Sequence, residues 1–495
     1  MNVATVLEMA SDGFSAAGAF SCAGRTVSYV ALRERVVVEA GRIRATDTRH
    51  VALVGENSLA VPVACFAAAW AGRVYAPVNP RLPEHTMRDL LARLEPYVRA
   101  GEFTGGAAGG TLSGSGGEAG PVEVDTDAEA VRLFTSGTSG TPKQAVLRHR
   151  HLTAYLFSSV DFGSAGPDEA ALIAVPPFHI AGTMSLFTNV FCGRRAVLLE
   201  SFSAERWLDT VHSERITHAF VVPTMLARIV NAMQPGDARV ASLRTLSYGG
   251  ALMPARVISR AMEVFGAHTD FVNAYGLTET SSTVAVLGPQ DHRDAVAATD
   301  EAGRRRLHSV GRPIPGVEIS VRDEAGRPVA SGEPGQIWIR GDQVSGEYAG
   351  QPGTMSDGWL VTGDLGELDG QGFVFVRGRA DDVIVRGGEN LSPGEIEEAL
   401  LRHPGVAEVA VVGVPDDEWG EVVAAMVVPV ASGRLDLAEL TAFSRAELGS
   451  FKTPTLFVLR EELPYSAVGK VLRRVVGEEL RYLAATGPSR EVQAR

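Results

Sequence analysis

The sequence predicts an α/β fold with more than one domain, on three observations. Segments with helical and with strand patterns alternate through residues 1–100 and again through residues 172–290, as they do in proteins built from layers of helices and sheets. Short strands with hairpin turns follow over residues 317–377, and helices then return. The length of 495 residues also exceeds one ordinary core, because a domain averages about 150 residues.

Composition restricts the class of protein. Hydrophobic residues make up 45% and charged residues 21% of the chain, which is typical of a globular protein. The net charge of −13 argues against a general nucleic-acid binder and against a protein that binds anionic membranes. We therefore expect neither nucleic acid nor membrane among its partners.

Three features lead us to expect a cytoplasmic protein. Cys22, Cys65 and Cys192 lie far apart without a Cys-x-x-Cys pair, which speaks against a disulfide framework or a zinc site. The N-terminus has no basic segment followed by an apolar run, so we expect no signal peptide. The longest apolar stretch, residues 59–72, is too short to span a bilayer and contains Pro62, so we predict a buried helix there.

The first hundred residues contain two predicted helices, each followed by a strand. Apolar residues recur at helical spacing over residues 31–43, and a short apolar strand follows at 50–54. A helix at 59–71 and a strand at 74–78 repeat this order. Residues 101–120 are rich in Gly and Ser, so we predict a flexible surface loop without a catalytic role.

Buried strands are predicted next, and then the pattern changes. Apolar runs predict strands near 173–175, 196–199 and 219–222. A polar, charged span over residues 290–308 ends this region. Hairpin turns between short strands then predict a β-rich subdomain. Its strands are expected at 317–321, 336–340 and 373–377.

The last part of the chain predicts a small α+β domain. Ser392 supplies a helix cap, Pro393 a first-turn proline and Glu395 an early carboxylate, which predict a helix that runs to about Leu401. The predicted elements after it are strands at 406–412 and 422–430, a helix at 437–448, a strand at 455–459 and a helix at 471–483.

Residues 135–143 form the stretch that is richest in phosphate-binding groups, with the sequence Thr-Ser-Gly-Thr-Ser-Gly-Thr-Pro-Lys. The glycines let the backbone approach an anion, the hydroxyls donate hydrogen bonds, and Lys143 adds a positive charge. Strand-like residues on both sides predict a hairpin tip. Pro142 and Gln144 flank the lysine, which excludes a Walker loop. Alone, the stretch is equally compatible with an ordinary surface turn.

Seven further clusters place polar groups on turns between apolar segments. Each one alone also has an ordinary explanation, such as a partly buried histidine, a tight turn, a helix cap or a solvated surface. Glu279 could hold Mg²⁺, and Asp364, which we expect on a loop, suits a ribose diol. The clusters are residues 176–182, 247–251, 273–279, 357–364, 378–382, 387–390 and 469–473.

Taken together and in this order, the segments resemble the adenylate-forming superfamily of acyl-CoA synthetases, peptide-synthetase adenylation domains and beetle luciferases. The match covers nearly the whole chain. The residues that carry it are 135–143, Phe178 and His179, 249–251, 275–279, 362–364, 378–381, and Gly469 and Lys470.

The resemblance implies a division into domains and a set of nucleotide contacts. It implies a large N-terminal domain of α/β subdomains plus a β-rich subdomain over residues 1–380, a hinge near Asp381, and a small mobile α+β C-terminal domain over residues 381–495. The implied contacts are Thr135, Ser136, Gly137, Thr138 and Lys143 for the β- and γ-phosphates of ATP, Thr278 for the α-phosphate, Glu279 for Mg²⁺, Gly249, Gly250, Ala251 and Tyr275 for adenine, and Asp364 and Arg379 for ribose, with Asn273 and Gly276 also assigned to the nucleotide.

The implied reaction has two halves. A carboxylate attacks the α-phosphate of ATP, and Mg²⁺ and lysine reduce the repulsion between the two anions. Lys470 is expected to bridge them. A thiol then attacks the acyl-adenylate after the C-terminal domain rotates about Asp381. For the thiol substrate, the resemblance assigns Gly387 and Gly388 to a pantetheine tunnel, and Trp419 and Phe451 to the CoA nucleotide.

The same resemblance describes the acid substrate. Phe178 and His179 stand where amino-acid-activating members place an Asp, which implies an acid without an α-amino group, and His179 is expected to swing between the acid pocket and the thiol tunnel. The pocket walls are mostly apolar or small, which favours a bulky hydrophobic acid. These walls are His179, Gly182, Thr183, Val221, Val222, Pro223, Tyr248, Gly249, Gly250, Ser281 and Ser282.

Two departures from the pattern leave alternatives open. Gln144 stands where a Gly commonly follows the loop lysine, and Val361 stands where a larger residue commonly precedes Thr362. The thiol acceptor is either CoA or the pantetheine of a carrier protein, and the enzyme performs either both half-reactions or only the second, from a supplied acyl-adenylate. A nucleotide-binding regulator without catalysis is the alternative of another class, against which Lys470, Glu279 and Asp381 argue.

Overall fold

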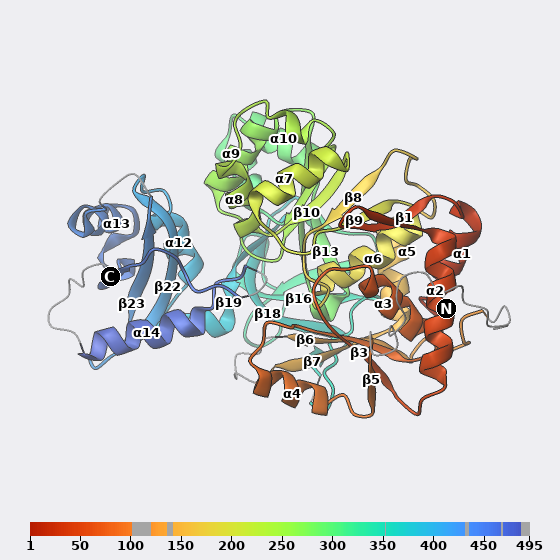
Figure 1. The fold of residues 1–495 in the computed structure, drawn as a ribbon. Coiled ribbons are helices and arrows are strands. Elements are labelled where there is room, and N and C mark those ends of the chain that lie inside the picture. The colour runs from red at the N-terminus through yellow and green to blue at the C-terminus, as the bar shows by residue number, and fades with distance from the viewer. Residues whose placement is uncertain (101–119, 136–141, 352, 431–434, 467–468, 487–495) are drawn as a thin grey trace. The chain divides into compact units, whose positions relative to one another are not determined.

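The structure is a computed structural model of the chain (Figure 1). It describes residues 1–100, 120–135, 142–351, 353–430, 435–466 and 469–486. The chain divides into two compact units, of which the first comprises Met1–Ile319 and Ile339–Val361 and the second Ser320–Trp338 and Thr362–Arg495. The family resemblance implies a domain border at a hinge near Asp381. A division into compact units does not test a hinge, so this border stays a prediction. The predicted loop at 101–120 lies outside the described residues, apart from Gly120.

The larger sheet of the first unit has parallel strands in its middle and antiparallel pairs at both edges. Parallel strands need crossover connections, and helices supply most of them. From one edge to the other, the described strands are β14 (Arg312–Pro313), β13 (Ser282–Leu287), β12 (Asp270–Leu277), β11 (Thr245–Gly249), β10 (His218–Val221), β8 (Ala170–Ile173), β9 (Arg195–Leu198), β1 (Gly18–Cys22) and β2 (Arg25–Ser28).

The helices of this region begin and end where the sequence supplies caps. The Ser203 side chain accepts from the Arg206 N–H at the start of one helix, and Gly193, with φ of 80°, ends another. The helices are α5 (His149–Ser159), α6 (Ile180–Cys192), α7 (Ala204–Ser213), α8 (Pro223–Asn231), η1 (Ala238–Val240), α9 (Ala255–Phe265) and η2 (Thr278–Thr280).

One prediction for this region needs correction, and one span without a predicted element is helical. The strand expected near 173–175 ends at Ile173, because Pro176 and Pro177 follow and prolines lack the N–H that pairing requires. The polar span 290–308 is largely helical. It begins with Pro289 at the first helical position and with an Asp291 carboxylate that accepts from the Gly288 N–H (3.2 Å). Its elements are α10 (Pro289–Ala297), α11 (Glu301–Arg305) and η3 (Arg306–His308).

A smaller sheet of the first unit carries the predicted phosphate hairpin. Its described strands, in spatial order, are β5 (Tyr97–Arg99), β3 (His50–Val54), β4 (Val74–Val78), β6 (Glu129–Thr135) and β7 (Lys143–Arg148). The first four lie parallel to their neighbours, and β6 pairs antiparallel with β7. The helices of the first hundred residues are α1 (Thr5–Phe14), α2 (Tyr29–Arg44), α3 (Ala60–Trp70) and α4 (Glu84–Ala92).

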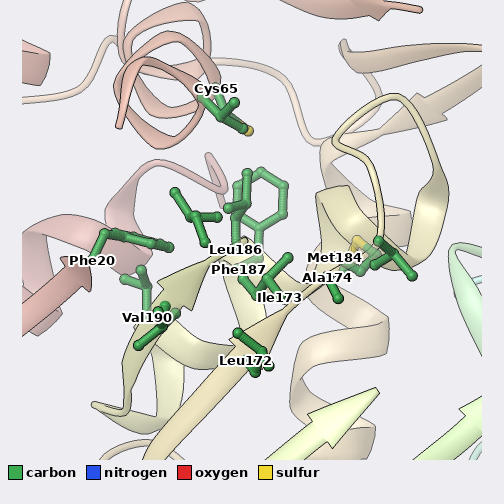
Figure 2. Close-up of a cluster of buried hydrophobic side chains, with 14 of the residues drawn as sticks. Phe20, Cys65, Leu172, Ile173, Ala174, Met184, Leu186, Phe187 and Val190 are labelled. Carbon is green, nitrogen blue, oxygen red and sulfur yellow. The ribbon is translucent and has the colours of Figure 1, made fainter. Parts of the chain in front are cut away.

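The two sheets share one hydrophobic core, in which α6 is central. Figure 2 shows Leu186 and Phe187 of α6 between Cys65 of α3 and the strand residue Ile173. The Phe187 ring meets Phe66 edge-on, with the centroids 5.2 Å apart. Both rings are fully buried, and truncation of a buried Phe costs about 3–5 kcal/mol. Helix α3, apolar on nearly every side, is therefore the buried helix that the sequence predicted.

The β-rich region forms a third sheet. The division between the two units falls inside three of its strands, at residues 319, 338 and 361. Its described strands are β15 (Val317–Arg322), β16 (Gly335–Gly341), β18 (Trp359–Leu368) and β17 (Met355–Ser356), with β19 (Val374–Arg379) paired to β18. Asp364 lies within β18 and not on a loop as expected, because the turn before it, at Asp357 and Gly358, closes earlier.

The C-terminal region is a sheet with helices packed against it (Figure 1). Alternate residues of β22 (Val406–Asp416) point to opposite faces. Val409 and Val411 pack with α12 (Pro393–Leu400) and α13 (Leu437–Lys452), and Ala410 and Val412 pack with α14 (Arg473–Thr486). The remaining elements are η4 (Ala380–Asp382) and the strands β20 (Ile384–Arg386), β21 (Glu389–Leu391), β23 (Gly420–Pro429) and β24 (Leu456–Leu459).

Two details of this region differ from expectation. Ser392 precedes α12 as predicted, but its hydroxyl donates to the Arg377 carbonyl (2.9 Å) and does not cap the helix. Helix α13 continues past residue 448 to Lys452, with a break at Gly449, whose φ is 73°. Throughout the described chain, the helices are too short or too polar to cross a membrane.

Candidate active site

The predicted phosphate hairpin is present. Strands β6 and β7 pair up to Thr135 opposite Lys143, so the described residues on both sides of the predicted loop are paired as expected. Both side chains are half-buried. Ser136, Gly137 and Thr138, also assigned to the phosphates, lie outside the described residues.

The structure explains Gln144. Adjacent residues of a strand point to opposite faces, so Gln144 turns away from Lys143 and into the protein, where it is 4% exposed. Its Oε1 accepts a long hydrogen bond from Arg132 Nη1 (3.5 Å), and Arg132 also donates to the Glu129 carboxylate from Nε (3.0 Å). Gln144 thus lies on the buried rear face of the hairpin, where a Gly would leave a gap.

The carboxyl ends of the parallel strands meet at one edge of the larger sheet, the usual place of ligand sites in such sheets. Gly249 ends β11 and Gly250 follows it, Tyr275 lies near the end of β12, and Val221 ends β10. A Cβ at Gly249 would lie 2.1 Å from the Ala274 carbonyl oxygen. Only glycine therefore allows these two strands to approach at this end.

Thr278 and Glu279 lie on a tight turn directly after β12. Ser281 and Ser282 follow with positive φ values of 54° and 104°, and non-glycine residues in this region of φ are concentrated at functional sites. The buried Gln343 amide holds the turn, since its Nε2 donates to the carbonyls of Thr280 (2.9 Å) and Thr283 (2.8 Å). Sequence reasoning did not identify Gln343.

Tyr348 is the second residue that sequence reasoning missed. Its hydroxyl donates to Glu279 Oε1, and the Lys143 Nζ lies 5.2 Å from the centroid of its ring. One side chain therefore contacts both the predicted metal ligand and the predicted phosphate-binding lysine. No motif marks Tyr348 in the sequence, because it lies 205 residues after Lys143 and its neighbours resemble an ordinary loop.

Several predicted walls of the acid pocket are buried in this structure. The Tyr248 ring has no exposed surface, and its hydroxyl is hydrogen-bonded to His292 Nε2 (2.9 Å). Thr183 and Ser281 are also fully buried, and their hydroxyls donate to the carbonyls of Pro177 and Gln343 (both 2.9 Å). These three side chains are core residues here, so they offer no wall to a substrate.

The remaining predicted walls divide into two groups. Val221 has no exposed surface, and Gly182 is packed so closely that a Cβ would lie 2.2 Å from the Pro176 carbonyl oxygen. His179 and Ser282 are half-buried and Gly250 is exposed. Val222 and Pro223 are buried. His179 occupies the position before α6, with its ring 5.4 Å from that of Phe178.

Asn273 is held inside the protein. Its side chain is 9% exposed, and Nδ2 donates to the Ser309 carbonyl (3.1 Å). The amide group therefore ties β12 to the segment after η3, and the nucleotide role expected for Asn273 stays a prediction. Tyr275, two residues on, is half-buried.

In the second unit, the two predicted ribose residues lie together. Asp364 of β18 stands opposite Arg379 of β19 in the strand register, and Arg379 Nη1 is 3.6 Å from the Asp364 carboxylate. Arg379 Nη2 donates to the Thr362 carbonyl (3.2 Å), and the Thr362 hydroxyl donates to the Ile337 carbonyl (2.7 Å). The carboxylate is thus fixed in the strand and neighboured by a cation.

Lys470 lies at the end of a short hairpin in the second unit. The Ser466 N–H donates to the Lys470 carbonyl (2.7 Å), the Lys470 N–H donates to the Ser466 hydroxyl (3.1 Å), and Tyr465 pairs with Val471. The Lys470 side chain is exposed. The turn therefore fixes the backbone of this lysine and leaves its ammonium group at the surface of the unit.

The predicted hinge residue Asp381 lies in η4. Its neighbour Asp382 is 3.5 Å from Arg473, which also pairs with Glu397 (2.6 Å) and donates to the Val411 carbonyl (2.7 Å). The pairing with carboxylates raises the pKa of the Arg473 guanidinium against the effect of its burial. The residue after the predicted hinge is thus anchored to α14 and α12.

The structure brings together the residues assigned to CoA. Trp419 and Phe451 meet edge-on at 6.0 Å, and the Gly387 N–H donates to the Trp419 carbonyl (2.8 Å). A Cβ at Gly387 would lie 2.8 Å from the Trp419 ring, so the glycine is needed for this approach. The Arg386 guanidinium lies 5.3 Å from the Trp419 ring and 5.0 Å from the Phe451 ring.

The described residues contain no group of three or more His, Cys, Asp or Glu side chains that could hold a metal ion. Glu279 by itself fits Mg²⁺, which proteins usually bind through one or two carboxylates together with substrate phosphates and water. A surface hollow of about 530 Å³ lies elsewhere and is lined by Arg49, Arg73, Glu129 and Arg148 among others. None of the predicted site residues lines it.

Comparisons with known proteins establish the family. A family model described as AMP-binding enzyme matches residues 7–100 and 102–349, and one described as AMP-binding enzyme C-terminal domain matches residues 395–470. The chain belongs to the AMP-binding enzyme family. This confirms the predicted membership of the adenylate-forming superfamily.

This AMP-binding enzyme matches curated relatives over most of their length. The chain is 35% identical to feruloyl-CoA synthase of Amycolatopsis sp over 91% of this chain and 93% of the relative. It is 33% identical to the fatty acid–[acyl-carrier-protein] ligase ScoC of Streptomyces coeruleorubidus, over 92% of this chain and 91% of the relative.

A solved structure confirms the fold class. The o-succinylbenzoate CoA synthetase MenE from Bacillus subtilis, in complex with the acyl-adenylate intermediate OSB-AMP, matches with a TM-score of 0.81 and 27% identity over 95% of this chain and 97% of that chain. The same protein, in complex with ATP and a magnesium ion, matches with a TM-score of 0.80. The predicted α/β fold is thereby confirmed.

Proposed function

We propose that this AMP-binding enzyme is an acid–CoA ligase. It activates a carboxylic acid with ATP to an acyl-adenylate and then transfers the acyl group to the thiol of CoA. The observation that carries this proposal is the 35% identity to feruloyl-CoA synthase over 91% of this chain and 93% of the relative. The site residues that the sequence predicted supply the chemistry, and their roles below are part of the proposal.

In the first half-reaction, an oxygen of the substrate carboxylate forms a bond to the α-phosphorus, the bond to the β-phosphate breaks, and pyrophosphate leaves. Thr135 and Lys143 bind the β- and γ-phosphates, Thr278 the α-phosphate, and Lys470 orients the carboxylate against it. Such a step depends on positioning and charge neutralisation. Bound Mg²⁺, held through Glu279 and the phosphates, would supply further neutralisation of the leaving group.

Adenine and ribose are bound by the two groups of residues described above. Gly249, Gly250, Ala251 and the Tyr275 ring form the adenine slot at the end of β11 and β12. Asp364 accepts hydrogen bonds from the ribose hydroxyls, because a carboxylate fixed within a strand is a preorganised acceptor. Support comes from the match to MenE solved with ATP and a magnesium ion.

In the second half-reaction, the thiol sulfur bonds to the acyl carbon, the carbon–oxygen bond to AMP breaks, and the thiol proton leaves to solvent or a base. The C-terminal domain rotates about Asp381 between the halves. Gly387 and Gly388 line the path of the pantetheine arm, and Trp419 and Phe451 contact the CoA nucleotide. The packing of Gly387 against the Trp419 ring supports a common role for these residues.

The proposed acid is bulky, hydrophobic and without an α-amino group. Phe178 and His179 leave no carboxylate at the position where an ammonium would need one. The similarity to a relative named feruloyl-CoA synthase supports an aromatic acid. The pocket is formed by the residues that stay near the strand edge, since Thr183, Tyr248 and Ser281 are in the core.

A second candidate acceptor is the pantetheine of a carrier protein. The relative ScoC is by name a fatty acid–[acyl-carrier-protein] ligase, so membership in this family is compatible with either thiol. CoA is the leading candidate because Trp419 is 38% exposed beside Arg386, and an exposed indole with a cation is suited to a nucleotide.

Incubation with ATP, Mg²⁺, CoA and a panel of aromatic and other hydrophobic acids tests the proposal, with pyrophosphate and thioester both measured. We expect both products, in equal amounts, from at least one acid. Pyrophosphate without thioester would favour a carrier protein as the acceptor. Thioester only from synthetic acyl-adenylate would restrict the enzyme to the second half-reaction. Neither product from any acid or adenylate, with tight ATP binding, would indicate a regulator.

A further inference from the structure

The segment 345–349 connects the two parts of the candidate phosphate site in the first unit. The N–H groups of Ser345 (2.8 Å) and Gly346 (3.3 Å) donate to the Glu279 carbonyl. On its other side, the Val146 N–H donates to the Glu347 carbonyl (3.0 Å), and Tyr348 is bridged to Ala145. The segment therefore lies along β7 next to Lys143 and against the turn that carries Glu279.

The backbone of this segment is fixed without the Tyr348 side chain. Arg148 donates two hydrogen bonds to the Glu347 carboxylate, from Nε (2.9 Å) and from Nη2 (2.7 Å). The Ala349 N–H also donates to the Gln144 carbonyl (2.9 Å). The hydroxyl of Tyr348 is consequently not required to hold the backbone of this segment in place.

The contact of the Tyr348 hydroxyl with Glu279 affects the orientation of the Glu279 carboxylate. The terminal torsion of a glutamate is broad and weakly restricted, so a free carboxylate presents its oxygens in many directions. A hydrogen bond from Tyr348 to Oε1 fixes the plane of the group. Carboxylates that bind metals are commonly oriented in this way by a hydrogen-bonding neighbour.

The ring of Tyr348 acts on the lysine. A cation within about 6 Å of the face of an aromatic ring is attracted to it, and Lys143 Nζ lies 5.2 Å from the centroid. The long lysine side chain loses several rotamers when it is held. A lysine already held above the ring loses less entropy when phosphates bind.

We propose that Tyr348 is a positioning residue that orients the Glu279 carboxylate for Mg²⁺ and holds Lys143 for the phosphates of ATP. The hydroxyl orients the Glu279 carboxylate, and the ring holds the Lys143 ammonium group. Tyr348 forms and breaks no bond in the reaction. The inference rests on the proposed function, because it assigns Mg²⁺ and ATP to this site.

Binding of ATP measured by calorimetry, without any acid and over a range of Mg²⁺ concentrations, tests the inference. Tyr348→Phe removes the hydroxyl and keeps the ring. We expect the Mg²⁺ concentration for half-maximal ATP binding to rise between about 10-fold and 100-fold, while ATP affinity at saturating Mg²⁺ stays within about threefold. Tyr348→Leu also removes the ring, and saturating Mg²⁺ should not restore its ATP affinity.

Tyr29→Phe is the matched control. Tyr29 is a buried tyrosine of the same unit whose hydroxyl donates to the Arg194 carbonyl (3.1 Å), away from the candidate site. It loses a hydroxyl hydrogen bond as Tyr348→Phe does, so it separates loss of stability from loss of positioning. Its Mg²⁺ dependence should equal that of the unmodified protein.

A double-mutant cycle makes the test specific. In a Glu279→Gln background, Tyr348→Phe should produce no further change in Mg²⁺ dependence, because the carboxylate it orients is gone. Equal effects of Tyr348→Phe in both backgrounds, or an unchanged Mg²⁺ dependence in the single variant, would overturn the inference. If the unmodified protein binds no ATP with Mg²⁺, the proposed function itself fails.

Discussion

At residue scale, lysine is rare in this chain, and two of its lysines stand where we propose chemistry. The sequence contains 46 Lys and Arg residues, and its lysines are Lys143, Lys452 and Lys470. Two of them are proposed catalytic-site residues, and the third follows Phe451 in the segment assigned to CoA. Elsewhere the chain uses arginine, whose planar group suits the many carboxylate pairs of its surface. The compact ammonium groups of Lys143 and Lys470 suit the phosphate and carboxylate contacts that we propose for them.

Individual residues also show the limits of prediction. Lys143, Gly249 and Glu279 were predicted as site residues because motifs carry their residue type and spacing. Tyr348 and Gln343 were not, since each acts through a contact with a residue more than sixty positions away. The orientation of Gln144 could have been inferred from strand alternation alone, because Lys143 precedes it on the same strand.

Gly249→Ala tests the close approach of β11 and β12. The new Cβ would lie 2.1 Å from the Ala274 oxygen, so the strands must separate, and we expect a loss of about 3 kcal/mol in the free energy of unfolding. Gly250→Ala is the control: its Cβ would meet Val222 at 3.6 Å, and its φ of 87° costs only about 1–2 kcal/mol. Urea unfolding measures both. Equal losses would contradict the packing argument.

His149 predicts a pH dependence of stability. Its Nδ1 accepts from the Val3 N–H (3.1 Å), and burial together with the nearby N-terminal charge lowers its pKa from 6.5 to about 4. The unfolded chain then binds the proton that the folded chain excludes. Stability is therefore complete above pH 6.5 and falls as the pH drops toward 4, by about 1.4 kcal/mol per pH unit.

Urea unfolding at pH 7 and pH 5 measures this effect. His149→Gln keeps an acceptor for the Val3 N–H and removes the titration, so its loss of stability between the two pH values should be smaller by about 2 kcal/mol than that of the unmodified protein. His85→Gln, at an exposed position, should leave the loss unchanged. Identical losses in all three proteins would exclude the burial of a neutral His149 as the cause.

At the scale of elements, the sequence predicted long apolar segments well and polar ones poorly. Strand β3 and helix α3 were placed almost to the residue, because buried apolar runs have few alternative structures. Helices α10 and α11 were not recognised, since their residues are polar and their apolar stripe is narrow. The signals for α10 were present in Pro289 and Asp291, which begin the helix.

Gln343→Leu tests how the turn that carries Glu279 is held. The substitution conserves volume and leaves the buried carbonyls of Thr280 and Thr283 without their donor. We expect a loss of about 2 kcal/mol or more in the free energy of unfolding, and a higher KM for ATP because the turn loosens. Gln371→Leu, at an exposed turn, should change neither. An unaffected KM for ATP in Gln343→Leu would show that the turn needs no such support.

At the scale of the whole molecule, family resemblance predicted more than local pattern did. The order of the motifs implied the adenylate-forming fold, which the match to MenE confirms. Side-chain burial could not be read from that order. Tyr248 and Thr183 were assigned to a pocket by position, whereas the structure places both in the core. Within each unit, contacts support a separate group of predicted site residues. Lys143 and Glu279 both contact Tyr348 in the first unit, and Asp364 lies beside Arg379 in the second.

The central claim is that one chain carries out two half-reactions and needs Lys470 for the first only. The direct measurement compares Lys470→Ala with the unmodified protein in pyrophosphate release from ATP and an accepted acid, and in thioester formation from synthetic acyl-adenylate and CoA. Arg474→Ala, at an exposed position on α14, is the control. We predict that pyrophosphate release falls at least about 100-fold, while thioester formation stays within about threefold. An equal fall in both rates, or no fall in either, would contradict the account.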